Sequence, residues 1–547
     1  MSEMQGKSAG ASEPGRTAYD VVVVGAGFAG LYALHRLRAM GLAVKVFEAG
    51  DGIGGTWFWN RYPGARCDVE SMEYSYSFSE ELQQEWDWPD RYSKQTDILR
   101  YINHVADRFD LRRDIQLETR VASAVYDAGV NRWTIETDRG DRVTAQFCIM
   151  AVGNLSTPRV PDFKGLESFQ GDWYHSGLWP KDGVDFSGKR VGVIGTGSTG
   201  IQIIPLVAKQ AKHLHVFQRT ANYSLPARNT PLPEDEVRAH KAEYAERRAA
   251  AYFTPFGISG YPPPEKAAVE DTPEARERHY VARWAKGGTI SFLFAYKDLL
   301  VNQESNDTAA EFVRQRIRET VKDAAVAELL APKDHPIGTK RICLDTDYYE
   351  TYNRDNVTLV DVRNAPITEI TPDGLRTENA DFALDAIIFA TGFDAMTGAV
   401  LEVDIRTTAG LTMQEKWRAG PKTYLGLMVA GFPNLFTITG PGSPGVKSQM
   451  ILSIEQHADW IVECIESLRE RGLSRIEATE AAEEAWVQHV NEVAESTLYP
   501  RANSWYMGAN IPGKPRVFMP YVGGVDRYTV ICKDVVERGY EGFAMTE

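Results

Sequence analysis

The sequence predicts an α/β fold built from two similar strand–helix–strand units, with a helical insertion after the second unit. Three observations predict it. A continuous apolar run at Val21 to Val24 leads into a glycine-rich turn, and the same pattern recurs at Arg190 to Ile194. Between about residues 231 and 330 the chain is rich in Ala, Glu, Arg and Lys and poor in strand-forming residues. Continuous apolar strands are typical of parallel sheets that helices cover on both faces.

The first unit is expected to start with a strand at Val21 to Val24. A helix at Leu31 to Met40 and a second strand at Ala43 to Phe47 complete it. Trp133 to Val143 is predicted to form two strands around a turn, because Arg-Gly-Asp interrupts the apolar pattern. Phe147 to Ala151 is predicted as a further strand.

The second unit repeats this order. A strand at Arg190 to Ile194 precedes a glycine loop, a helix at Ile201 to Ala211 and a strand at His215 to Phe217. In the insertion, His240 to Ala251 and Ala309 to Leu330 are predicted helices, and we expect Asn306 or Asp307 to cap the second one.

Later segments are expected to return to both sheets. Val357 to Val360 and Ala386 to Phe389 are predicted strands. Ile454, with further apolar residues at helical spacing, predicts a long helix that ends at Gly472.

Composition limits the class of protein. The chain has 547 residues, of which 43% are hydrophobic and 25% charged, and this is typical of a large globular protein. Its formal net charge of -15 disfavours nucleic acid as a partner, because phosphate backbones are repelled. No apolar run reaches the roughly 18 residues of a membrane span, so no membrane contact is expected. We take a monomer as the default oligomeric state.

The cysteines and the first residues indicate the compartment. The five cysteines are scattered and form no CxxC pair, which favours a reducing, cytoplasmic location. Residues 1–18 are small and polar, so we expect a disordered lead-in and no signal peptide. The ten histidines form no HExxH motif and no Cys/His cluster, so no metal site is expected.

The glycines of the first unit form a dinucleotide-binding fingerprint of the Rossmann type. Gly25 makes the tight turn, Gly27 lets the backbone approach a pyrophosphate, and Gly30 lets helix and strand pack closely. Glu48 ends the second strand, where an acid binds a ribose hydroxyl and would repel a 2′-phosphate. The site therefore favours FAD or NAD, and Gly55, the second of a glycine pair, matches many FAD-binding sites.

The second unit carries the same fingerprint with a different ending. Gly195, Gly197 and Gly200 repeat the motif, and Ser198 lies within it. Arg219 stands where the acid would be, and its guanidinium can bind a 2′-phosphate with two hydrogen bonds. This selects NADP over NAD, with an ordinary exposed arginine as the alternative.

Two such sites on one chain imply hydride transfer from NADPH to FAD. Disulfide reductases need a CxxC-like pair, which the sequence lacks, so oxygen is the leading electron acceptor. We therefore expect two Rossmann-like dinucleotide-binding domains with a helical insertion. Their predicted bounds are residues 19–150 plus 390–547 for FAD, 151–225 plus 331–389 for NADP, and 226–330 for the insertion.

Two long motifs carry a resemblance to a known family. Residues 169–180 read FQGDWYHSGLWP and match the pattern FxGxxxHxxxWP. Residues 54–68 read GGTWFWNRYPGARCD and match GGxWxxxx(F/Y)P(G/M)xxxD. From Tyr19 to about the C-terminus the chain resembles the Type I Baeyer–Villiger monooxygenases. It is most similar to their phenylacetone and steroid monooxygenases, with which it shares residues 59–68 and 513–519.

The resemblance implies a flavin-dependent monooxygenase that uses NADPH and O2 to convert ketones to esters or lactones. In this family, reduced FAD adds O2 to give a C4a-peroxyflavin, which attacks the ketone to form a tetrahedral (Criegee) adduct. Two alternatives are a flavin N- or S-oxygenating monooxygenase and a non-catalytic protein that binds FAD and NADPH. The motif's Trp-Pro ending and an arginine beside the flavin separate the first alternative from the family.

The resemblance also implies roles for single residues. Arg341 is the catalytic arginine beside the flavin, and Asp68 orients it. Arginine suits this role because its pKa exceeds about 12, so it cannot give a proton to the peroxide. Lys340 is expected to join Arg219 and Thr220 at the NADP 2′-phosphate.

Other residues of the motifs are expected near the cofactors. Thr56 and Trp57 follow the glycine pair at the flavin, and Trp505 corresponds to a tryptophan on a mobile loop over NADP and substrate. Two positions depart from the family. Asn154 stands where its nearest relatives have Gln, and Lys447 lies in a loop that lines the substrate pocket in the family.

Overall fold

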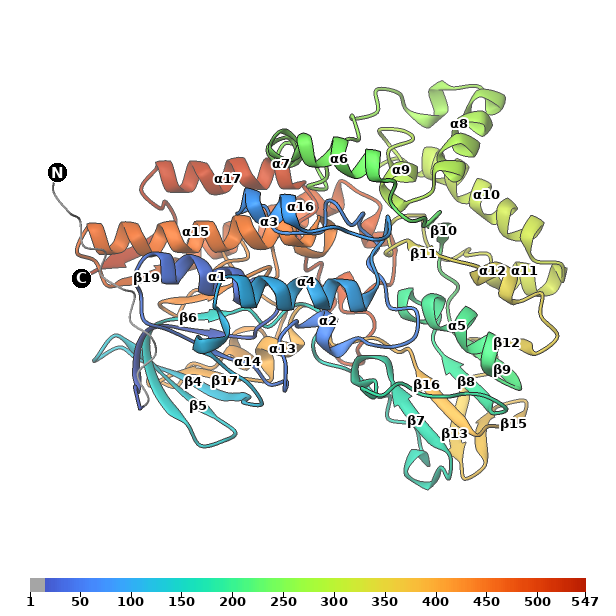
Figure 1. Cartoon of the computed structure of the whole chain (residues 1–547), viewed down its shortest axis with the longest axis horizontal. Coiled ribbons are helices and arrows are strands. Elements are labelled where there is room, and N and C mark those ends of the chain that lie inside the picture. Colours follow the sequence, from blue (N-terminus) through green and yellow to red (C-terminus); the bar gives the residue numbers. More distant parts are fainter. Residues whose placement is uncertain (1–14) are drawn as a thin grey trace.

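The structure, a computed structural model, describes residues 15–547 (Figure 1). Two main sheets with helices on their faces confirm the predicted α/β fold. Most of the lead-in that we expected at residues 1–18 lies outside the described residues, and the first strand begins at Ala18.

The larger sheet has eight strands in the order β17-β4-β5-β6-β1-β2-β3, with β18 paired to β6. Their bounds are β1 (Ala18–Val24), β2 (Val44–Phe47), β3 (Ile115–Gln116), β4 (Val121–Asp127), β5 (Arg132–Thr137), β6 (Arg142–Met150), β17 (Asp404–Thr407) and β18 (Leu435–Thr437). Helix α1 (Phe28–Ala39) follows β1 and packs against α15 (Met450–Glu470), as Figure 1 shows. Segments from opposite ends of the chain therefore cover this sheet together.

The smaller sheet has five parallel strands in the order β12-β9-β8-β16-β7. Their bounds are β7 (Asp172–His175), β8 (Arg190–Ile194), β9 (His213–Gln218), β12 (Val357–Asp361) and β16 (Ala386–Phe389). Helix α5 (Ser198–Gln210) follows β8. β1 lies between the parallel strands β6 and β2, and β8 lies between the parallel strands β16 and β9. The strand order therefore reverses direction beside each of them, and α/β proteins bind their ligands at the carboxyl ends of strands at such a point.

Both helices of the glycine units begin earlier than the sequence predicted. We expected starts at Leu31 and Ile201, whereas α1 begins at Phe28 and α5 at Ser198. The reason is that the third glycine of each motif belongs to the first helical turn. The predicted turn between β5 and β6 is confirmed, and Gly140 takes a φ of 82° in it.

The helical insertion lies beyond one end of the smaller sheet (Figure 1). It contains α6 (Glu234–Ala242), α7 (Tyr244–Ala251), α8 (Pro273–Lys286), α9 (Thr289–Leu293), α10 (Gln303–Thr320) and α11 (Ala324–Leu330). Both predicted helices of this region are wrong in extent, because each is divided in two.

The second of these helices also has a different cap from the predicted one. Asn302, not Asn306 or Asp307, caps α10 by accepting a hydrogen bond from the backbone N–H of Ser305. Asp323 then caps α11 with bonds to two backbone N–H groups, so a new helix starts there. Asn306 is buried and donates instead to the carbonyl oxygens of Leu299 and Ile337.

A short parallel pair connects the insertion with the second glycine unit. β10 (Ser224–Pro226) pairs with β11 (Cys343–Asp345), which places the preceding residues 340 and 341 beside that unit. The remaining elements are α2 (Thr56–Trp59), α3 (Glu80–Glu85), α4 (Gln95–Arg108), α12 (Tyr348–Thr351), β13 (Ile367–Thr371), β14 (Gly374–Thr377), β15 (Asp381–Ala383), α13 (Gly398–Leu401), α14 (Met413–Lys416), β19 (Arg475–Ala478), α16 (Glu480–Glu495), α17 (Val525–Glu537) and β20 (Phe543–Thr546).

All five cysteines are free and buried. In the described part of the chain, no helix combines the length and the apolar character that crossing a bilayer requires. The same residues contain no group of three His, Cys, Asp or Glu side chains placed to hold a metal ion.

Candidate active site

The first glycine loop is shaped by close backbone contacts. Gly25 has a φ of 102°, and a Cβ there would lie 2.6 Å from the carbonyl oxygen of Ala151. A Cβ at Gly30 would lie 1.8 Å from the carbonyl oxygen of Gly25. Only glycine fits both positions, and the bare backbone leaves room for a bound group at the start of α1.

Glu48 holds this loop in place. Its carboxylate accepts hydrogen bonds from the backbone N–H groups of Ala26 at 2.7 Å and Gly50 at 2.8 Å. Burial raises the pKa of Glu48, and these two hydrogen bonds oppose the shift.

A large cavity, of about 1320 Å³ with part of it open to solvent, adjoins the first glycine loop. Most of the expected flavin contacts lie on its wall: Gly25, Gly27, Glu48, Gly55, Thr56 and Trp57. The indole N–H of Trp57 donates to the Tyr74 hydroxyl at 3.2 Å, which fixes the ring. Asn154 lines the same cavity, and its amide donates to the Thr439 hydroxyl at 3.4 Å.

The second glycine loop repeats the design of the first. A Cβ at Gly195 would lie 2.5 Å from the carbonyl oxygen of Ala390, and one at Gly200 would lie 2.2 Å from that of Gly195. A Cβ at Gly197 would meet nothing within 4 Å, so this part of the loop is open. Ser198 begins α5 and lies 3.3 Å from the Cys343 sulfur.

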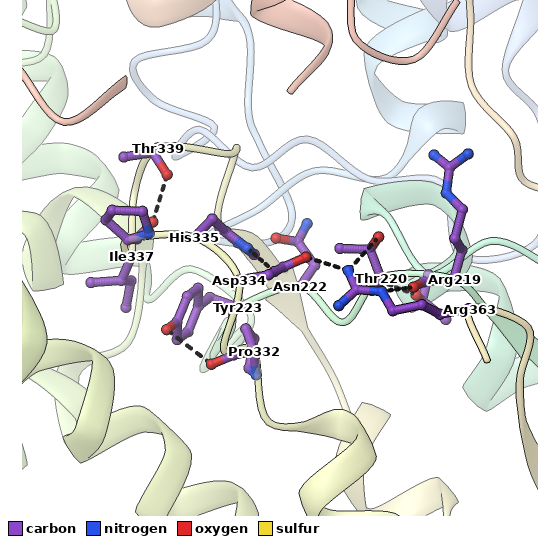
Figure 2. Close-up of polar contacts among 12 residues, drawn as sticks. Arg219, Thr220, Asn222, Tyr223, Pro332, Asp334, His335, Ile337, Thr339 and Arg363 are labelled. Carbon is purple, nitrogen blue, oxygen red and sulfur yellow. Dashed lines mark hydrogen bonds and ion pairs between the residues drawn. The ribbon is translucent and has the colours of Figure 1, made fainter. Parts of the chain in front are cut away.

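Figure 2 shows Arg219 and Arg363 next to each other beyond the end of β9, and Lys340 interacts electrostatically with both. Arg363 donates to the carbonyl oxygen of Arg219 at 3.1 Å and to the Thr220 hydroxyl at 3.4 Å, and it forms an ion pair with Asp334. Burial lowers the pKa of Lys340, and Asp334 opposes this shift. The positive charges of Arg219 and Arg363 lower the pKa of Lys340 further, so the three side chains lie close enough to repel one another.

Asp334, the acidic residue of this cluster, is already paired with His335 and Arg363. Hydrogen bonds from His335 and Arg363 hold the pKa of Asp334 well below its usual range. Within residues 15–547 the Arg219 guanidinium has no side-chain partner, and Figure 2 shows it pointing away from Asp334 and Arg363. The cluster therefore has a net positive charge, and its unpaired Arg219 guanidinium can bind a phosphate. Sequence reasoning missed Arg363, because only the pairing of β12 with β9 brings it here.

Arg341 and Asp68 form the pair that the family resemblance implied. Arg341 donates from Nε to Asp68 Oδ2 at 2.6 Å and from Nη2 to Oδ1 at 2.7 Å, and its Nη1 donates to the Val446 carbonyl at 3.0 Å. Asp68 raises the pKa of Arg341 above its usual range. Burial alone would raise the pKa of Asp68, but Arg341 outweighs it and the net shift is downward. Both side chains are therefore ionised.

This pair lies on the wall of a second, smaller cavity of about 570 Å³, part of it open to solvent. Lys447, Tyr499 and Tyr506 share that wall. The segment from Val446 to Met450 borders both cavities, because Val446 lines the smaller one and Met450 the larger.

Trp505 and His175 lie outside both cavities. Trp505 is half-buried in a 3-10 turn, where its ring lies 4.3 Å from that of Tyr506. His175 is buried, and its Nδ1 accepts the backbone N–H of Gly177 at 3.0 Å. This contact fixes the orientation of the His175 ring within the motif at residues 169–180.

Comparison with known proteins identifies the family. Residues 18–234 match the family described as Flavin-binding monooxygenase-like. A Baeyer–Villiger monooxygenase from Pseudooceanicola batsensis is 45% identical over 95% of each chain. A phenazine N-monooxygenase from Lysobacter antibioticus is 40% identical over 97% of each chain. The solved structure of an oxidized steroid monooxygenase bound to NADP is 54% identical, with a TM-score of 0.92 over 97% of this chain and 100% of that one. The chain belongs to the Type I Baeyer–Villiger monooxygenases.

Proposed function

We propose that this protein is an FAD- and NADPH-dependent monooxygenase that uses O2 to convert ketones to esters or lactones. The ion pair of Arg341 with Asp68 carries the proposal, because it places a permanent cation on the wall of the smaller cavity. Ketone-dependent oxidation of NADPH, with matching O2 uptake, tests it. Loss of NADPH at the same rate with and without every ketone of a panel would contradict it.

FAD, when bound, would accept hydride from NADPH and activate O2. We assign it to the larger cavity, because the bare backbone at Gly25 and Gly27 and the N-terminus of α1 suit a pyrophosphate. Glu48 would face the ribose, and Thr56 and Trp57 would lie along the bound group. Gly30 supports this site through packing alone.

Arg341 would stabilise the negative charge that develops on oxygen during attack on the carbonyl. Three of its five N–H donors contact Asp68 and Val446, which leaves at most two for the cavity and the neighbouring Tyr506 hydroxyl. Asp68 would act by orientation, since its two oxygens fix the plane of the guanidinium. A charge fixed before the reaction needs no reorganisation during it.

NADPH would bind with its pyrophosphate at Gly195, Gly197 and Gly200, and with Ser198 at the start of α5. Arg219, Thr220 and Lys340 would hold the 2′-phosphate, and Trp505 would close over NADPH and substrate. We further propose that the domain bounds given above apply, with residues 390–547 returning to the FAD-binding domain. This is supported by the pairing of β17 and β18 with the larger sheet.

Arg219→Ala should raise the KM for NADPH by roughly 10- to 100-fold, because one hydrogen-bonded ion contact with phosphate is lost. The KM for NADH should change far less, since NADH has no 2′-phosphate. Steady-state kinetics with both coenzymes measures this. Equal changes in the two KM values would remove Arg219 from the phosphate site. Arg471→Ala, at the end of α15, is a control that should change neither value.

N-oxygenation is a second candidate function, because a phenazine N-monooxygenase is 40% identical to this chain. Aromatic nitrogen heterocycles supplied with NADPH and O2 test it by mass spectrometry. Formation of an N-oxide faster than any ester would favour this function over the first.

A further inference from the structure

Lys447 places a second basic side chain on the wall of the smaller cavity, and no carboxylate of the described residues is paired with it. An ammonium has three N–H donors, and one of them reaches the Tyr506 hydroxyl at 3.4 Å. The ring centroids of Tyr499 and Tyr506 lie 4.2 and 4.5 Å from Nζ. Within residues 15–547 no acid forms an ion pair with Lys447, and none offsets the fall in its pKa. Two tyrosine rings offset part of the cost of this charge, but they do not neutralise it.

The two cations of this cavity differ in how they are compensated. Asp68 uses both carboxylate oxygens on Arg341, so that pair carries no net charge. When Lys447 is protonated, it therefore gives the cavity a net positive charge. Burial lowers the pKa of Lys447, and the charge of Arg341 lowers it further, as expected for a cation without an acidic partner. Most of the remaining wall is apolar, formed by Val69, Phe256, Ile258, Ile290, Leu293 and Ile342.

We propose that Lys447 binds an anionic group of the substrate, so that the pocket selects ketones that carry a carboxylate over uncharged ketones of the same size. The inference rests on the proposed function, because it concerns the substrate of the same site. The apolar wall would receive the carbon skeleton, Arg341 would face the reacting carbonyl, and Lys447 would receive the carboxylate. An ionic ligand would also supply the partner that this buried charge lacks.

Matched pairs of oxo acids and their methyl esters test the proposal, with one to four methylene groups between carbonyl and carboxylate. The wild-type protein should favour one acid over its ester in kcat/KM. Lys447→Met should lower that acid-to-ester ratio by roughly tenfold or more, mainly through the KM of the acid. Lys447→Arg keeps the charge and should keep most of the preference. Lys533→Met removes an exposed lysine of α17 and should leave the ratio unchanged.

The ratio should also depend on pH in a defined direction. The lysine loses its proton as pH rises, and because its pKa is lowered it does so at a lower pH than an ordinary lysine. The preference for the acid should therefore fall as pH rises, and the Lys447→Met ratio should stay flat. The other groups that face Lys447 keep their charge state. Arg341 stays cationic and Asp68 ionised, and burial raises the pKa values of Tyr499 and Tyr506.

Two results would overturn the proposal. One is an acid-to-ester ratio that is equal in the wild-type protein and in Lys447→Met at every spacer length. The other is a loss of NADP+ affinity in Lys447→Met, measured by equilibrium binding, with the ratio unchanged, because Lys447 would then serve the coenzyme. Conversion of the uncharged esters by the wild-type protein would uphold the proposed function in either case, so the two failures are distinguishable.

Discussion

Arg341→Ala is expected to abolish ester formation while NADPH still reduces the bound flavin. The variant loses the cation that faces the cavity, and removal of a preorganised charge of this kind lowers rates by about 10²–10³-fold. Hydride transfer should continue, because Arg341 is not among the residues assigned to NADPH. Anaerobic stopped-flow spectroscopy follows flavin reduction, and gas chromatography with mass detection follows the ester.

Two further variants show what Arg341 contributes. Arg341→Lys keeps a charge but cannot bind both oxygens of Asp68 in one plane, so we expect activity between those of the wild-type protein and Arg341→Ala. Asp68→Asn keeps the shape and removes the charge that orients the guanidinium. Ester formation by Arg341→Ala at the wild-type rate would show that another group stabilises the developing charge.

Gly30→Ala is expected to yield a protein that has lost its FAD. The added methyl group would lie 1.8 Å from the carbonyl oxygen of Gly25, so α1 would have to move away from β1. Overpacking of this kind costs about 1–3 kcal/mol, and here it falls on the loop assigned to the pyrophosphate. The ratio of flavin to protein absorbance in the purified variant measures the loss.

Gly197→Ala is the matched control for that change. It alters the equivalent loop of the second unit, where an added Cβ meets nothing within 4 Å. This variant should keep its fold and its full FAD content. If Gly30→Ala retained as much flavin as Gly197→Ala, close packing of α1 on β1 would not be required for FAD binding.

Local patterns made the core of each glycine unit predictable. β8 and β16 lie at their predicted bounds, because buried parallel strands are short apolar runs with clear ends. Glu48 and Arg219 were assigned from their distance to the glycine motif, which the strand–helix–strand geometry fixes. Helix ends were harder to predict, since Asn302 and Asp323 compete with neighbouring polar residues as caps.

Contacts between distant segments could not be read from local patterns. Asp68 and Arg341 meet across two parts of the chain, and only the family resemblance suggested their pairing. Arg363 gives no local signal at all, because its position depends on the pairing of β12 with β9. Lys447 was noticed as a departure from the family, but its place between two tyrosine rings depends on a loop more than fifty residues later in the sequence.

The most direct test of the proposed function uses isotopic oxygen. The purified protein is incubated with NADPH, ¹⁸O₂ and an uncharged ketone, and the product is analysed by mass spectrometry. We predict an ester or lactone that contains one ¹⁸O atom, with the second atom in water and one NADPH consumed for each product. Recovery of unchanged ketone from every reaction, with NADPH consumed and only hydrogen peroxide formed, would contradict the proposed function.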